Sequence, residues 1–543
     1  MTSNSDLALA EFFRASGLDP DLMLVDYVFA WASRHPRRVA LVDDAGQVSY
    51  EELTADILRL ADALRGLGLV SGEYISIALP NCREWVVAHL AGMLIGLITN
   101  PILLIHRERG IARALSSVES RILITVDSYR GFDYVDAVLR SRANAPSLEH
   151  VVVVGGRVSE HEGVTPWKEL MAVGQVISPE DLRPLKSTAD SAAVVFYTSG
   201  TTGSPKGVVH THAALIGASV PWVDRLGMSD GDAVHMTSPF GHLMGYQFGV
   251  SLPLILGGTG VFQAEWDPER FIALVDEWRV VHTSGATPFL FDFLRSLKDP
   301  ARVSSLKRFL CAGAPIPRAL VEDAAHRLPM LDVLGAWGQT ECGLISMCLP
   351  SDSEDKRRTT DGSALPGVKI RVQGDDGAPL PPGSRGNLQV QSPFLFRQYL
   401  GDLAGTVDAF TPDGWFITGD LGTVDSDGFV RISGRAKDLI IRGGENIPVV
   451  EIEDELLQHT QIRDVAIVGV PHERLQEIAA ACVVLEDPLR ALRLEDVQDY
   501  LRSRGVAKNY WPEVLVIRES LPRTAVGKVQ KFMLRRALEA AVR

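Results

Sequence analysis

The sequence has few cysteines, and their arrangement excludes the structures that cysteines usually indicate. Five cysteines are scattered along 543 residues. No pair has the Cys-x-x-Cys spacing of a zinc site or a redox pair, and their odd number argues against a disulfide framework. We therefore expect a reducing compartment, of which the cytoplasm is the simplest.

The chain also lacks an excess of basic residues. Its 54 lysines and arginines are outnumbered by 68 aspartates and glutamates, which gives a formal net charge of −14. Proteins that bind nucleic acids are usually basic, so we expect no nucleic-acid partner. The first residues, Met1 to Asp6, lack the basic region and the apolar core of a secretion signal.

Long apolar runs are rare, and only one could be mistaken for a membrane span. Trp85 to Ile105 carries no formal charge and is long enough to cross a bilayer. Pro101 interrupts the run, because a proline disfavours helix at the residue before it, here Asn100. We expect a buried helix over about 83–96, then a buried strand or loop, and no transmembrane segment.

Helical and extended patterns alternate along most of the chain. Ser49 and Glu52 form a capping box before apolar residues at helical spacing, and Gly66 can end that helix. Residues 74–79, 151–154 and 192–197 have the composition of buried strands, and this alternation favours α/β layers. Strand-like pieces from about 370 to 433 predict a β-rich subdomain. We therefore predict an α/β fold with a large N-terminal domain of layered α/β subdomains plus a β-rich subdomain, and a small α+β C-terminal domain.

The strongest chemical signal is the segment from Tyr197 to Gly207, which is rich in glycine and hydroxyl residues and contains Lys206. Glycines let the backbone approach a ligand closely, and exposed N–H groups, hydroxyls and the lysine can surround phosphate oxygens. Pro205 stands where a Walker A loop has glycine, so the loop is of another type. A plain surface turn does not need this order of residues. The predicted ATP contacts here are Thr198, Ser199, Gly200, Thr201, Thr202, Gly203 and Lys206.

Five further segments follow the loop in the chain: 311–315, 336–341, 414–420, 434–438 and 521–528. Taken alone, they have ordinary explanations as tight turns, a helix cap or a solvated lysine. In this order, and after the loop, they resemble the motifs of the adenylate-forming superfamily. That superfamily includes acyl-CoA synthetases, firefly luciferases and the adenylation domains of nonribosomal peptide synthetases. The resemblance extends over roughly 45–531.

The resemblance implies how ATP is bound and used. Glu341 would hold Mg²⁺, a cation that prefers oxygen ligands, and Asp420 would accept hydrogen bonds from the ribose. Lys528 would bridge the substrate carboxylate and the phosphate. Trp337 takes a position where the family more often has tyrosine against adenine. The implied catalytic residues are Thr198, Lys206, Glu341 and Lys528, and the further nucleotide contacts are Gly313, Ala314, Pro315, Trp337, Gly338, Thr340, Asp420 and Arg435.

The resemblance also implies two domains that rotate relative to each other. It gives an N-terminal domain, 1–434, a hinge, 435–438, with Lys437 at the pivot, and a small mobile C-terminal domain, 439–543. Residues 441–447 resemble the loop that lines the coenzyme A tunnel, with Arg442, Gly443, Gly444 and Glu445 as its expected contacts. Pro448 directly follows Ile447, whereas many relatives have one residue between them.

The residues expected around the acid are mostly small or apolar, which predicts an apolar acid of the medium-chain fatty, alicyclic or aryl type. The expected acyl pocket consists of Phe240, His242, Met244, Gly245, Gly285, Gln339 and Gly343. For His242, a satisfied core histidine is the alternative.

The expected reaction forms acyl-AMP and pyrophosphate, then acyl-CoA and AMP, using ATP, Mg²⁺ and coenzyme A. The chain ends about 15 residues after Lys528, which leaves no room for a carrier domain and favours free coenzyme A as acceptor. The alternative is a stand-alone enzyme that loads a separate carrier protein. A luciferase-like oxidation and a catalytically inactive ligand-binding homologue are the remaining readings. The expected partner is a small-molecule carboxylic acid, and the sequence is compatible with a homodimer.

Overall fold

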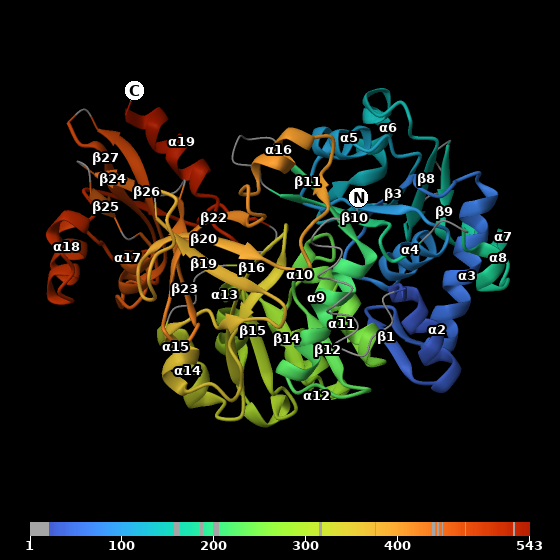
Figure 1. Cartoon of the computed structure of the whole chain (residues 1–543), viewed down its shortest axis with the longest axis horizontal. Coiled ribbons are helices and arrows are strands. Elements are labelled where there is room, and N and C mark those ends of the chain that lie inside the picture. Colours follow the sequence, from blue (N-terminus) through green and yellow to red (C-terminus); the bar gives the residue numbers. More distant parts are fainter. Residues whose placement is uncertain are drawn as a thin grey trace.

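In the part of the chain that the structure describes, the strands form four main sheets and one short hairpin, β6 (Ser128–Tyr129) with β7 (Phe132–Asp133) (Figure 1). The computed structural model describes residues 21–156, 163–184, 188–198, 206–313, 318–374, 376–436, 440–442, 445–447, 449–472, 474–524 and 527–542.

The first sheet has eight strands, in the order β21-β11-β10-β4-β3-β5-β8-β9. In this order, the six strands from β10 through to β9 are parallel to one another. β11 and β21 are antiparallel additions at the β10 edge. The three strands predicted from apolar runs are β3, β8 and β10, as expected for parallel strands buried on both faces. The strands are β3 (Tyr74–Ala78), β4 (Ile98–Pro101), β5 (Ile122–Val126), β8 (His150–Val154), β9 (Val164–Pro166), β10 (Ala192–Thr198), β11 (Lys206–Thr211) and β21 (Gln398–Tyr399).

The second sheet has nine strands, in the order β18-β17-β16-β15-β14-β12-β13-β1-β2. Its central strands, from β16 to β1, are parallel, and the outer strands β2, β17 and β18 pair antiparallel. The strands are β1 (Val39–Asp43), β2 (Gly46–Ser49), β12 (Ala233–Met236), β13 (Thr259–Val261), β14 (His282–Gly285), β15 (Arg308–Cys311), β16 (Asp332–Gln339), β17 (Gly343–Met347) and β18 (Ser363–Ala364).

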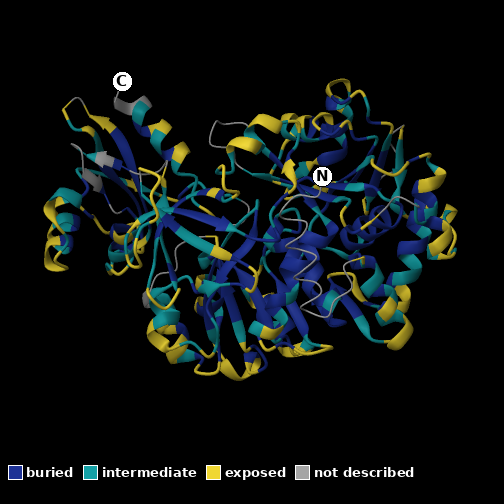
Figure 2. Ribbon diagram, in the orientation of Figure 1, coloured by how far each residue is buried: buried dark blue, intermediate teal, exposed yellow. Residues whose placement is uncertain are grey.

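Helices lie between the two sheets and on their outer faces. α4 (Arg83–Leu94) contacts β3 and β4 of the first sheet and β1 of the second, and α9 (His212–Arg225) contacts β11 and β17. Successive strand residues point to opposite faces. Leu310 of β15 therefore joins the central core, whereas Phe309 joins the outer core under α12 and α13. Figure 2 shows the sheets and the helices between them buried, with exposed residues on the outer helices and loops.

The remaining helices of this part cover the layers or connect the strands. They are α2 (Leu24–Arg34), α3 (Tyr50–Gly66), α5 (Glu108–Ser116), α6 (Tyr134–Ser141), α7 (Trp167–Val173), α8 (Pro179–Leu182), α10 (Leu243–Tyr246), α11 (Leu252–Leu256), α12 (Pro268–Trp278), α13 (Thr287–Ser296), α14 (Arg318–Arg327), α15 (Glu354–Thr359) and α16 (Leu403–Asp408).

Two local predictions are confirmed. The capping box opens α3: the Ser49 hydroxyl accepts from the Glu52 amide at 3.3 Å, and the Ser49 amide donates to the Glu52 carboxylate at 2.8 Å. The uncharged run at 85–105 divides into the buried helix α4 and strand β4, because Gly96 takes a left-handed turn with φ of +80° between them. Over the described part of the chain, the helices are all too short or too polar to span a membrane.

Two smaller sheets complete the fold. The predicted β-rich region is an antiparallel sheet of β19 (Lys369–Gln373), β20 (Gly386–Gln391), β22 (Phe416–Val424) and β23 (Val430–Arg435). The last sheet has α17 and α18 on one face and α19 on the other, each with its own apolar core. Its elements are β24 (Ile440–Arg442), β25 (Glu445–Ile447), α17 (Val449–Leu456), β26 (Ile462–His472), β27 (Gln476–Leu485), α18 (Leu494–Ser503), β28 (Val514–Arg518) and α19 (Lys531–Val542). The predicted α/β class is confirmed.

Candidate active site

Several residues predicted to contact nucleotide or acid lie at one edge of the nine-stranded sheet. β12, β14, β15 and β16 are parallel neighbours, so their carboxyl ends meet at this edge, where open α/β sheets bind ligands. Gly285 ends β14, Gly313 follows β15 with φ of +83°, and Gln339 ends β16. Ala314 and Pro315, also predicted to contact nucleotide, lie outside the described residues.

The predicted phosphate loop connects two antiparallel strands of the eight-stranded sheet. Thr198 ends β10 and is the register partner of Lys206, which begins β11. The Lys206 ammonium lies 3.8 Å from the Asp402 carboxylate and 4.4 Å from the centre of the Tyr399 ring. Ser199, Gly200, Thr201, Thr202 and Gly203 lie outside the described residues.

Thr340 and Glu341 lie in the tight turn between β16 and β17. The turn requires glycine at position 338, because a Cβ there would lie 2.2 Å from the Gly343 carbonyl oxygen. The Glu341 carboxylate accepts a hydrogen bond from the Tyr399 hydroxyl at 3.0 Å. A hard oxygen donor in this position fits Mg²⁺, which is usually bound by one or two carboxylates together with substrate phosphates. Within the described ranges, no cluster of three or more His, Cys, Asp or Glu residues could hold a metal by itself.

A buried histidine supports the same turn from β11. His210 Nε2 lies 2.6 Å from the Thr340 carbonyl oxygen. Burial lowers the pKa of His210 to about 4, so the ring is neutral at pH 7. The carbonyl can only accept, so Nε2 carries the proton and donates it. Sequence reasoning missed His210, which lies four residues after Lys206 within an apolar strand.

Asp420 of β22 is buried and is held by three donors. Its Oδ2 accepts from Trp337 Nε1 at 2.7 Å and from Gln339 Nε2 at 2.6 Å, and its Oδ1 lies 2.6 Å from Arg435 Nε. A carboxylate offers about four acceptor positions, so capacity remains for a sugar hydroxyl. The Gln339 amide also donates to the Thr418 carbonyl at 2.9 Å. The Gln339 side chain, which was predicted to line the acyl pocket, is therefore hydrogen-bonded to Asp420.

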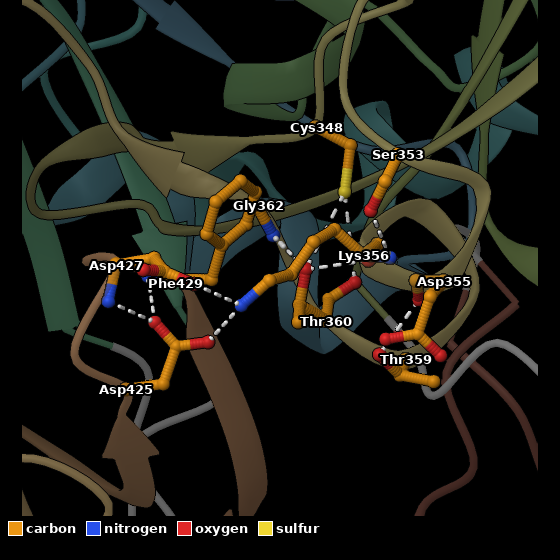
Figure 3. A network of polar contacts seen from close by, with 10 residues as sticks. All are labelled: Cys348, Ser353, Asp355, Lys356, Thr359, Thr360, Gly362, Asp425, Asp427 and Phe429. Carbon is orange, nitrogen blue, oxygen red and sulfur yellow. Dashed lines mark hydrogen bonds and ion pairs between the residues drawn. The ribbon is translucent and has the colours of Figure 1, made fainter.

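The β22–β23 hairpin, which carries Asp420 and Arg435 as register partners, is fixed to α15 (Figure 3). Lys356 Nζ of α15 lies 2.5 Å from Asp425 and 3.0 Å from Asp427, both in the hairpin turn. The same ammonium lies 4.7 Å from the centre of the Phe429 ring. These contacts attach the hairpin to the N-terminal part of the protein, which fixes the position of Asp420.

The segment after β12 supplies an apolar wall. Phe240 is buried against Trp85 and Phe262. Asn81 holds the turn before it, because its side chain donates to the Ser238 carbonyl and accepts from the Phe240 amide, both at 2.9 Å.

His242 follows this wall and carries a buried Nε2. That atom has no hydrogen-bond partner among the residues described. Burial lowers the pKa of His242 to about 4 and leaves it neutral at pH 7. Of the other predicted pocket residues, Met244 is half-buried in α10, and Gly343 is buried with φ of +65°.

Gly245 is expected to tolerate no side chain. A Cβ there would lie 1.9 Å from the Pro239 carbonyl oxygen, so the backbone of the wall would have to move. We expect Gly245→Ala to lower the free energy of unfolding by about 1–3 kcal/mol in chemical denaturation, as for other overpacked sites. Gly66→Ala is the matched control, because its Cβ would meet no atom within 4 Å. Equal stability of the two variants would contradict this reading of the wall.

Gly527, the residue before Lys528, lies against the residues that follow Gly285 of the predicted acyl pocket. Gly527 has φ of +81°, and a Cβ there would lie 3.3 Å from Pro288 Cγ and 3.8 Å from Ala286 Cβ. The Lys528 side chain is exposed. Ion pairs also connect the residues from β24 onward with the preceding chain. Arg431 pairs with Asp454 at 3.2 Å, and Arg295 pairs with Glu486 at 3.5 Å.

The residues predicted for the hinge and the coenzyme A tunnel are only partly described. Arg442 is paired with Glu513, with Nε at 2.8 Å from the carboxylate oxygen. Glu445 begins β25. Lys437, Gly443 and Gly444 lie outside the described residues.

Comparisons with known proteins identify the class. The sequence pattern of the AMP-binding enzyme family matches residues 28–400, and that of the AMP-binding enzyme C-terminal domain matches residues 451–528. The chain therefore belongs to the AMP-binding enzyme family. Within that family it is an AMP-forming acid–thiol ligase of the acyl-CoA synthetase type, as the sequence predicted.

Individual relatives cover nearly the whole chain. It is 34% identical to the medium-chain fatty-acid–CoA ligase of Escherichia coli (strain K12) over 528 residues, which cover 96% of this chain and 92% of that protein. It is 29% identical to the salicyl-AMP ligase / salicyl-S-ArCP synthetase of Mycobacterium tuberculosis (strain ATCC 25618 / H37Rv), covering 98% and 94%. The solved structure of the anthranilate CoA ligase AuaEII in complex with anthranoyl-AMP matches with a TM-score of 0.87 at 24% identity, covering 97% of this chain and 99% of that one. That last likeness shows the fold.

Proposed function

We propose that the protein activates an apolar carboxylic acid as its acyl-adenylate and transfers the acyl group to free coenzyme A. The observation that carries the proposal is the arrangement around the carboxyl edge of the nine-stranded sheet. A buried carboxylate with remaining acceptor capacity, Asp420, lies at the end of the site where β16 finishes. The apolar wall around Phe240 follows strand β12 of the same sheet.

In this proposal the nucleotide is held by the elements that meet at that edge. Asp420 and Arg435 contact the ribose, Lys206 and the loop before it contact the phosphates, and Glu341 with phosphate oxygens holds Mg²⁺. When bound, Mg²⁺ neutralises negative charge on the triphosphate and helps pyrophosphate to leave. Trp337 is oriented by its hydrogen bond to Asp420, so the indole lies beside the proposed ribose site.

The first half-reaction joins two anions. The substrate carboxylate oxygen attacks the α-phosphorus of ATP, and the bond from that phosphorus to the bridging oxygen breaks as pyrophosphate leaves. Such transfers depend mainly on positioning and on stabilisation of charge. Lys206 and Lys528 supply positive charge, and the approach of Gly527 to Pro288 supports placing Lys528 beside the acid.

In the second half-reaction the thiol of coenzyme A gives up its proton and attacks the acyl carbon, and AMP leaves. We propose that residues 439–543 rotate about a hinge at 435–438, with Lys437 as pivot, between the two steps. The rotation would break the pairs Arg431–Asp454 and Arg295–Glu486. Arg295–Glu486 is exposed, and an exposed ion pair contributes only about 0–1 kcal/mol, so that pair would not prevent the rotation. Arg431–Asp454 is partly buried and would oppose the rotation more.

The acid and the acceptor are tested separately. Pyrophosphate release is measured over a panel of medium-chain, alicyclic, benzoic, dicarboxylic and amino acids, and activity restricted to the apolar members is expected. With the best acid, AMP release is then compared with coenzyme A or with a panel of phosphopantetheinylated carrier proteins. Release that depends on coenzyme A supports the proposal. Acylation of a carrier protein without turnover on coenzyme A would replace it with the carrier-loading alternative, for which the salicyl-S-ArCP synthetase relative is the precedent.

A further inference from the structure

Tyr399 lies beside the strand that begins with Lys206. It ends the two-residue strand β21, where it is the register partner of Val208 in β11. The next amide, of Leu400, donates to the Gly207 carbonyl at 2.7 Å, and the Tyr399 amide donates to the Thr406 hydroxyl at 2.9 Å. The residue is only 7% exposed. Its backbone is therefore fixed on both sides of the side chain.

The Tyr399 side chain contacts two oppositely charged groups. Its hydroxyl donates to Glu341 Oε1 at 3.0 Å, and the Lys206 ammonium lies 4.4 Å from the centre of its ring. A tyrosine hydroxyl is protonated at neutral pH, and an ionised carboxylate can only accept, so the hydroxyl is the donor of this bond. A cation at this distance from an aromatic ring is attracted by the ring.

These contacts order groups that come from distant parts of the chain. Glu341 belongs to the β16–β17 turn and Lys206 to the start of β11. Without a fixed neighbour, a glutamate and a lysine side chain would each lose rotamer freedom when ATP binds. Tyr399 restricts both before the ligand arrives, which is the condition for preorganised charge stabilisation.

We propose that Tyr399 is a positioning residue that sets the carboxylate of Glu341 and the ammonium of Lys206 for the magnesium-bound triphosphate. This inference rests on the proposed function, in which those two groups contact the metal and the phosphates. It goes further because it assigns the joint positioning of Glu341 and Lys206 to Tyr399, which lies outside the phosphate loop and outside the β16–β17 turn.

The test is calorimetric and needs no turnover. ATP binding is titrated at a series of Mg²⁺ concentrations for the wild type and for Tyr399→Phe, which keeps the ring and removes only the hydroxyl. We expect the Mg²⁺ concentration for half-maximal effect to rise about tenfold, as for one lost hydrogen bond to a charged group. AMP binding should stay within about twofold, because AMP lacks the β- and γ-phosphates. Tyr129→Phe is the matched control. Tyr129 lies in the β6–β7 hairpin, and its hydroxyl donates to the Ala264 carbonyl at 2.9 Å.

A double-mutant cycle separates positioning from general destabilisation. In a Glu341→Gln background, Tyr399→Phe is expected to cause little further change in Mg²⁺ dependence, because the carboxylate it orders is gone. Thr406→Val, which loosens the Tyr399 backbone without altering its side chain, should shift the Mg²⁺ dependence in the same direction. It provides the test if Tyr399→Phe does not fold.

Unchanged Mg²⁺ dependence in Tyr399→Phe, or equal losses of ATP and AMP binding, would overturn the inference. The proposed function would instead be overturned if ATP binding depends on Tyr399 as expected but the wild type releases pyrophosphate with none of the acids in the panel.

Discussion

Lys528→Ala is expected to slow acyl-adenylate formation at least about 100-fold while leaving thioester formation from supplied acyl-AMP within about twofold of the wild type. The size of the loss follows from removing one group that stabilises developing charge. The selectivity follows from geometry. Gly527, which precedes Lys528, lies against Pro288 beside the predicted acyl pocket. The charge of Lys528 is needed only while the carboxylate and the triphosphate are brought together.

The measurement compares pyrophosphate release with single-turnover thioester formation. Lys508→Ala is the control, because it removes an exposed lysine of the same part of the chain without approaching the site. Equal losses of Lys528→Ala in both half-reactions would contradict a role confined to the first.

Asp420→Ala is expected to weaken both half-reactions, because the AMP moiety is present in both. The substitution removes the proposed hydrogen bond to the ribose and leaves Trp337, Gln339 and Arg435 without their shared acceptor. At about 1.5–3 kcal/mol for one hydrogen bond to a charged group, the dissociation constants of AMP and ATP should rise roughly 10- to 100-fold.

Equilibrium titration with AMP and with ATP measures this loss. Asp376→Asn is the matched control, since it changes an exposed carboxylate between β19 and β20 of the same sheet that is not a partner of Lys356. A loss confined to ATP, with AMP bound normally, would contradict the assignment of Asp420 to the ribose.

The sequence allowed prediction of the elements whose signals are local. The capping box at Ser49 and the apolar strands depend on neighbours within a few residues. The order of the motifs then connected Lys206, Glu341 and Asp420 by resemblance. The structure brings Glu341 to the hydroxyl and Lys206 to the ring of Tyr399, and it places Asp420 beside Trp337.

What could not be predicted depends on contacts between distant segments. Tyr399 and Asp402 meet Lys206 because β21 pairs with β11, about 190 residues away in the sequence, and no local pattern carries that pairing. Gln339 was assigned to the acyl pocket from its place in a motif. At the end of a strand a small change of side-chain direction decides which neighbour it meets, and here it meets Asp420.

The attachment of the β22–β23 hairpin to α15 has a kinetic consequence. Asp420 and Arg435 precede the proposed pivot and are held to the N-terminal part through Lys356. The groups proposed to hold the ribose therefore stay in place while the C-terminal residues rotate. No step of the proposed reaction then requires acyl-AMP to dissociate from the protein. Once pyrophosphate has left, bound acyl-AMP would therefore proceed to thioester formation. Little of this reactive mixed anhydride would be lost to dissociation and hydrolysis before the thiol binds.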